Sequence, residues 1–86
     1  MLEICVDERD FARPAELMDY LQRKLDFPAW FGGNLRALND CLGDISEPTR
    51  ITIIRRDPTP DTWFDRATIV IVRAALENDY LEARVR

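Results

Sequence analysis

Histidine is absent from this sequence, and lysine occurs only once. Without histidine, the chain lacks the commonest general base at neutral pH, the base of the serine and cysteine triads, and the usual zinc ligand. Only three glycines are present, and none belongs to a G-x-x-x-x-G-K or G-x-G-x-x-G loop that would hold phosphate. The 16 aspartates and glutamates lack the spacing of a calcium-binding loop. We therefore expect no catalysis, no metal site and no cofactor.

Cysteine is also scarce, with Cys5 and Cys41 far apart in the sequence and no C-x-x-C pair. This spacing argues against a disulfide framework, a zinc site and a thioredoxin-type motif, so we expect two reduced, partly buried thiols. One alternative from another class stays open, a weak enzyme that uses Cys41. No neighbouring base argues for a lowered thiol pKa there.

Long apolar runs are missing, so no segment is predicted to span a bilayer. The first residues, MLEICVDERDF, lack the basic start and apolar run of a secretory signal, and we expect a cytoplasmic protein that does not bind membranes. The 86 residues, 47% hydrophobic and 33% charged, predict a single globular domain over residues 1–86. A net charge of -4 disfavours direct binding of nucleic acid and favours a basic protein partner.

Apolar residues that alternate with polar ones predict short strands at residues 2–6, 50–55 and 81–85. In the first strand Leu2, Ile4 and Val6 are expected to face inward. Helical spacing predicts a helix from Pro14 to near Pro28 and a second one that Asn34 caps and Gly43 ends.

The segment from Trp63 to Ala75 carries two conflicting patterns. Residues 68–72 are a β-branched run typical of a strand, whereas the apolar residues of the whole segment recur at helical spacing. Its length favours a buried helix. Helical connections between neighbouring strands normally give a parallel sheet. We therefore predict the α/β class, with a three-stranded parallel sheet packed by helices in two layers.

Residues 27–42, FPAWFGGNLRALNDCL, form the most informative segment. This segment resembles the signature of the barstar family of intracellular ribonuclease inhibitors. The pattern aromatic-aromatic-Gly-x-Asn-Leu-x-Ala-Leu-x-Asp-Cys-Leu is matched, in order and at fixed spacing, by residues 30–42. The rest of the chain is similar to the family in element order and length.

The resemblance implies a barstar-like fold and a function as a protein inhibitor of a ribonuclease or ribonuclease-like toxin. In that family a loop and the second helix plug the nuclease active site, and an acidic side chain, here Asp40, lies where substrate phosphate would bind. The chain is expected to be a monomer alone, to form a one-to-one complex, and to serve as an antitoxin or immunity protein. The partner-binding residues that the resemblance implies are Trp30, Gly32, Gly33, Asn34, Leu35, Arg36, Asn39, Asp40, Asp44 and Glu77.

Some positions depart from the family pattern. Arg36 stands where the family has an acidic contact residue, Asn39 and Ile45 replace aromatics, and Arg73 is basic where an acid is expected. These departures keep an alternative open, a barstar-fold binding module whose partner is not a ribonuclease. Trp30 and Phe31 could also close the core beneath the loop, and we assign Phe31 to the core.

Overall fold

The structure, a computed structural model, describes residues 1–29 and 31–86, and these residues form three parallel strands and three α-helices. The strands are β1 (Leu2–Asp7), β2 (Thr49–Ile54) and β3 (Leu81–Val85). The α-helices are α1 (Pro14–Leu25), α2 (Leu35–Gly43) and α3 (Trp63–Glu77), and a short 3-10 helix, η1 (Glu8–Asp10), follows β1. The predicted α/β class and three-stranded parallel sheet are confirmed.

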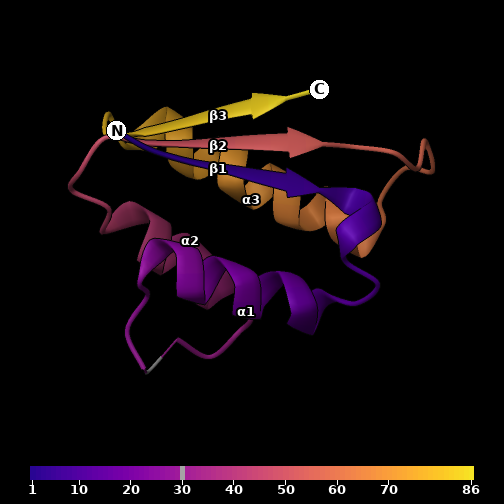
Figure 1. Ribbon diagram of the computed structural model, residues 1–86, viewed down its shortest axis with the longest axis horizontal. Coiled ribbons are helices and arrows are strands. Elements are labelled where there is room, and N and C mark those ends of the chain that lie inside the picture. Colours follow the sequence, from indigo (N-terminus) through magenta and orange to yellow (C-terminus); the bar gives the residue numbers. More distant parts are fainter. Residues whose placement is uncertain (30) are drawn as a thin grey trace.

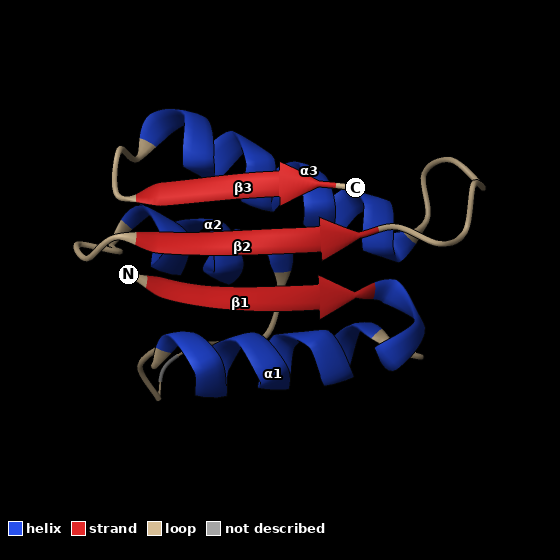
Figure 2. Ribbon diagram, turned by 45° about the horizontal axis from the view of Figure 1, so that its top comes forward, coloured by secondary structure: helices blue, strands red, loops and turns tan. Residues whose placement is uncertain are grey.

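The sheet has the order β1-β2-β3, with β2 in the centre. Parallel neighbours cannot be joined by a tight turn, so helices must carry the chain back to the starting edge. These helices lie on one face of the sheet (Figure 1). In a view turned by 45°, the sheet lies in front, with α2 and α3 behind it and α1 along the edge of β1 (Figure 2). The fold therefore has two layers, and one face of the sheet stays open.

The core lies between the sheet and the helices. Because side chains alternate across a strand, Ile4, Val6, Ile51, Ile53 and Leu81 all point toward the helices and are buried. The helices contribute buried residues at a spacing of three and four, among them Leu17, Leu21, Leu38, Leu42, Phe64 and Ile71. Each such side chain stabilises the fold by about 1.5–3 kcal/mol through removal from water.

The segment with conflicting patterns is helical, as its length predicted. Thr68, in the β-branched run, is buried inside α3, and its hydroxyl donates a 2.9 Å hydrogen bond to the carbonyl of Phe64. This bond satisfies the polar atom of Thr68 in an apolar environment, so burial against the sheet outweighs strand propensity. No helix in the described residues is long and apolar enough to cross a membrane.

Two burial predictions are wrong. Leu2 is largely exposed, because it is the first residue of an edge strand and borders a surface hollow beside Leu25 and Ile45. Cys5 is exposed rather than partly buried, because it alternates with the buried Ile4 and Val6 and so points to the open face.

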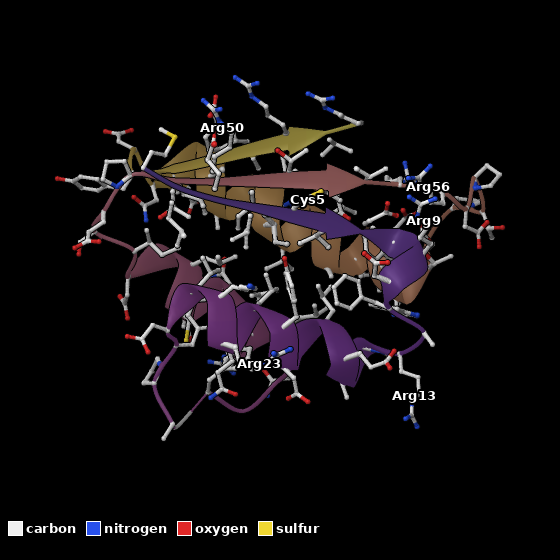
Figure 3. All side chains as sticks on the ribbon, in the orientation of Figure 1. Cys5, Arg9, Arg13, Arg23, Arg50 and Arg56 are labelled. Carbon is white, nitrogen blue, oxygen red and sulfur yellow. The ribbon has the colours of Figure 1, made fainter. Side chains whose placement is uncertain are left out.

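Asp7 connects the carboxyl end of β1 to the segment after β2. Its carboxylate accepts hydrogen bonds from Nη2 and Nε of Arg56 at 2.8 and 3.1 Å and from the backbone N–H of Arg9 at 3.2 Å. Arg9 and Arg56 both lie at this end of the sheet (Figure 3). The hydrogen bonds from Arg56 are the main cause that lowers the pKa of Asp7 from 3.8 to about 2.

Because the folded-state pKa is the lower one, the charged Asp7 stabilises the fold above about pH 4, and this contribution is lost as the pH falls through about 2. We predict that Asp7→Asn lowers the free energy of unfolding at pH 7, and that the difference from wild type shrinks between about pH 4 and pH 2. Urea unfolding followed by circular dichroism measures both. Asp19→Asn, an exposed change on α1, is the control. A deficit that does not vary with pH would contradict the prediction.

Candidate protein-binding site

The family motif at residues 27–42 covers the loop before α2 and most of α2 itself. The Asn34 side chain caps this helix, because its Oδ1 accepts a 2.8 Å hydrogen bond from the N–H of Ala37. Gly33, just before the cap, has φ = 70°, a left-handed conformation that favours glycine. The predicted cap is confirmed, and the turn before it depends on Gly33.

Burial of one face of α2 leaves its other face exposed. Leu38, Cys41 and Leu42 point into the core. Arg36 and Asp40, one turn apart, therefore lie on the exposed side. They form no ion pair with each other in the described part of the chain, so the charge of the Asp40 carboxylate is not neutralised by Arg36.

The C-terminal ends of α2 and α3 are joined by the side chain of Asn78. Its Nδ2 donates to the carbonyls of Leu42 at 3.0 Å and Ile45 at 2.9 Å, and its Oδ1 accepts from the N–H of Tyr80 at 2.9 Å. A helix leaves its last carbonyls without partners inside the helix, and Asn78 supplies a donor to one of those at the end of α2. This amide therefore fixes where α2 ends relative to α3.

An acidic hollow of about 460 Å³ lies where these two ends meet. It is lined by residues of both segments: Asn39, Asp40, Gly43, Asp44, Ala74, Glu77, Asn78, Asp79 and Tyr80. Its carboxylates are those of Asp40, Asp44, Glu77 and Asp79, and no arginine or lysine is among the described residues of its wall. None of these carboxylates forms an ion pair within residues 1–29 and 31–86. The hollow therefore presents negative charge that nothing in the described chain neutralises.

A second hollow, of about 280 Å³ and mostly apolar, lies at the other end of α2. It is lined by Pro14, Met18, Gly33, Asn34, Leu35, Trp63 and Arg66, so α1 and α3 both contribute to its wall. The exposed surface along α2 thus runs from an apolar hollow at its first turn to the acidic hollow at its last. Such a combination of apolar and charged areas is typical of protein-binding surfaces.

Most of the residues that the sequence predicted for the site fall on this surface. Asn39, Asp40, Asp44 and Glu77 share the wall of the acidic hollow. Gly33, Asn34 and Leu35 line the apolar hollow at the other end of α2. The other predicted positions lie outside both hollows: Gly32 and Arg36 are exposed, and Trp30 is outside the described residues.

Phe31 is a core residue, as predicted. It is buried, and its ring meets that of Phe27 edge to face with centroids 5.1 Å apart. This contact attaches the loop before α2 to the hydrophobic core.

Sequence reasoning missed Asn78, Asp79 and Tyr80, which complete the wall of the acidic hollow. No motif marks them, because their role depends on contact with a helix more than thirty residues earlier in the chain. The available signal was weak: an asparagine directly after a long helical pattern is a common helix end.

The carboxylates of the acidic hollow raise the question of a metal ion, and Cys41 raises that of a nucleophile. In the described part of the chain, no group of three or more histidine, cysteine, aspartate or glutamate side chains is placed to hold a metal. Cys41 is buried, and burial, followed by the charges of Asp44 and Asp40, raises the pKa of its thiol. A raised thiol pKa disfavours the reactive thiolate, which argues against the alternative in which Cys41 is a nucleophile.

Two comparisons with known proteins agree with one another. The sequence profile of the family described as "Barstar (barnase inhibitor)" matches residues 1–80. A 42-residue stretch is 52% identical to "Putative ribonuclease inhibitor YrdF" of Bacillus subtilis (strain 168). This stretch is 49% of the present chain and 46% of the relative, so the match spans about half the length of that protein.

Loss of the Asn78 amide should loosen the junction of α2 and α3. We predict that Asn78→Ala lowers the free energy of unfolding by about 1–3 kcal/mol, because the carbonyls of Leu42 and Ile45 lose their donor. Asn78→Asp keeps the acceptor for the Tyr80 N–H but replaces the donor with a carboxylate oxygen, so it should be at least as unstable. Denaturant unfolding of both variants is the measurement. Wild-type stability of Asn78→Asp would show that the donated bonds contribute nothing.

The exposed and buried cysteines should differ sharply in reactivity. We predict that the native protein reacts promptly with one equivalent of a thiol reagent at Cys5, while Cys41 reacts only after unfolding. Cys5→Ser should therefore show no prompt reaction. Prompt labelling of Cys41 in native Cys5→Ser would support the enzyme alternative instead.

Proposed function

Because the chain belongs to the barstar family, we propose that it inhibits a ribonuclease by covering the enzyme's active site with α2, the loop before it and the C-terminal end of α3. The observation that carries this proposal is the acidic hollow, whose wall combines carboxylates from α2 and from the end of α3 and contains no described basic residue. The name of the relative, a ribonuclease inhibitor, supports the same partner class.

The charge of the hollow is the right one for a nuclease. A ribonuclease binds a polyanion, so its active site concentrates positive charge. Carboxylates can accept charge-assisted hydrogen bonds from the same arginine and histidine groups that hold phosphate. In this proposal Asp40 is the central acceptor, and Asp44, Glu77 and Asp79 strengthen the negative field around it.

The framework of the hollow supports tight binding. Asn34 caps α2 at its start, and Asn78 holds its last turn. Binding to a preorganised surface costs less ordering entropy than binding to a loose one. The apolar hollow beside Gly33 and Leu35 adds uncharged contact area next to the charged centre.

The remaining features of the function follow from this mechanism. The protein acts as an inhibitor and not as an enzyme. One copy of the site blocks one nuclease molecule. Neither nucleic acid nor a membrane is bound directly. Such an inhibitor protects RNA in the cytoplasm, either from the cell's own nuclease or, as an antitoxin or immunity protein, from an incoming toxin.

Arg36 sets the range of partners in this proposal. It lies one turn before Asp40 on the exposed side of α2, so a nuclease that is basic opposite that position is repelled. The same observation favours the second candidate function, a barstar-fold module that binds a protein other than a ribonuclease. The two functions differ in whether a captured partner cleaves RNA.

The test uses immobilised chain and a lysate of the source organism. We predict that the wild type retains a ribonuclease and that purified wild type inhibits RNA cleavage by it. Asp40→Asn should weaken inhibition at least about tenfold, because it removes the charge at the centre of the interface. Asp19→Asn removes the same charge from the exposed surface of α1 and should leave inhibition unchanged.

Salt supplies a second readout of the mechanism. Added salt should slow the association of the wild type more than that of Asp40→Asn, because it screens the attraction between the acidic hollow and a basic site. Equal inhibition by wild type and Asp40→Asn would contradict the central role of Asp40. A retained partner without ribonuclease activity would favour the second function.

A further inference from the structure

β3 forms the edge of the sheet opposite β1. β3 ends the sheet order, and no further strand pairs with it in the described part of the chain. At the opposite edge, the Tyr20 hydroxyl of α1 donates a 2.9 Å hydrogen bond to the carbonyl of Cys5 in β1. Unpaired backbone groups at a sheet edge are a template for pairing with another strand. The two edges therefore differ, because a helix protects only that of β1.

The direction of the unpaired groups follows from the bonds between β2 and β3. The N–H of Thr49 bonds the carbonyl of Tyr80, and the N–H of Arg86 bonds the carbonyl of Ile53. Residues 80, 82, 84 and 86 thus direct their backbone groups toward β2. By alternation, Leu81, Ala83 and Val85 direct theirs outward, although the N–H of Leu81 is used by the carbonyl of Asn78.

The helix beside this edge exposes apolar side chains. Ile69 is 49% and Leu76 81% exposed, and they lie two turns apart on one side of α3. Ile69 borders a hollow together with Val85 of β3, which is also exposed, so this side of α3 is the one next to the β3 edge. Glu77 lies about a quarter of a turn around α3 from this stripe and is in the wall of the acidic hollow. An unpaired strand edge and an exposed apolar stripe therefore adjoin.

We infer that the β3 edge pairs antiparallel with the β3 edge of a second copy of this chain, so that the two sheets form one continuous sheet. A twofold axis perpendicular to the sheet places α3 of both copies on the same face, where their apolar stripes around Ile69 and Leu76 meet. This dimer replaces the monomer expected from the sequence.

The charges of β3 favour a second copy of this chain as the partner, and they favour one register of the two paired β3 strands. With Ala83 opposite Ala83 of the second copy, the outward backbone groups of both strands can bond, and Glu82 of each copy faces Arg84 of the other. A shift of one strand by two residues keeps the same side chains on the open face. It places Glu82 opposite Glu82 in one direction and Arg84 opposite Arg84 in the other. The strand is therefore complementary to itself in one register and repulsive in the adjacent ones.

The side chains involved already belong to a charged row on the open face. Arg50 of β2 donates to Glu3 of β1 at 2.6 Å and to Glu82 of β3, and Arg84 lies 3.5 Å from Glu82. Arg50 points away from the helices (Figure 3). In the dimer, Arg84 of the second copy extends this row of alternating charges across the interface.

The experiment is sedimentation velocity over micromolar to millimolar concentrations. The wild type should show a dimer with twice the mass of the chain, and Arg84→Glu should be monomeric, because it places Glu82 opposite a glutamate. Arg23→Glu makes the same charge change on exposed α1 and should leave the dimer intact. A wild type that is monomeric throughout, or a dimer that Arg84→Glu does not affect, would overturn the inference.

A mixture of two charge-reversal variants tests the register of the β3–β3 pairing directly. Glu82→Arg alone should also be monomeric, whereas an equimolar mixture with Arg84→Glu should restore a dimer, because opposite charges face each other again in both pairs. Ala83→Pro removes an outward N–H without touching the bonds to β2, so it should fold, by circular dichroism, and remain monomeric. A mixture that stays monomeric, or an Ala83→Pro variant that folds and dimerises as wild type does, would exclude this strand pairing.

Discussion

The hydrogen bonds of one amide side chain, that of Asn78, determine how the exposed surface is arranged. Asn78 holds the carbonyls of Leu42 and Ile45 at the end of α2 while it ends α3 and bonds the N–H of Tyr80. Carboxylates from segments more than thirty residues apart in the sequence thereby line one hollow. Like charges repel one another, so their shared position depends on packing and hydrogen bonds that do not involve the charges themselves.

Much of the architecture was predictable because two periodicities are strong in this chain. Alternation in β1 and the three-to-four spacing in α1 and α3 reflect burial against a single core, and parallel pairing then follows from the helical connections. The motif at residues 27–42 also predicted one side of the site, since the cap at Asn34 and the exposed position of Asp40 are properties of a single helix.

The features that could not be predicted from the sequence depend on contacts between segments that are distant along the chain. Asp79 and Tyr80 carry no local signal, and they join the site only because α3 ends beside α2. The same holds for the pairing of Asp7 with Arg56, and for Leu2, whose exposure depends on where the helical layer stops. Both sides of α3 are apolar enough to predict burial, so the sequence alone could not show that Ile69 and Leu76 face outward beside β3.

The central claim is that a ribonuclease binds across the ends of α2 and α3, and backbone amide chemical shifts of the labelled chain test it most directly. Titration with the captured ribonuclease should shift the amides of residues 33–44 and 77–80 most, while those of α1 and of the open sheet face stay near their free positions. Changes concentrated on the open sheet face or on α1, with residues 33–44 unaffected, would contradict the claim and place the partner elsewhere on the molecule.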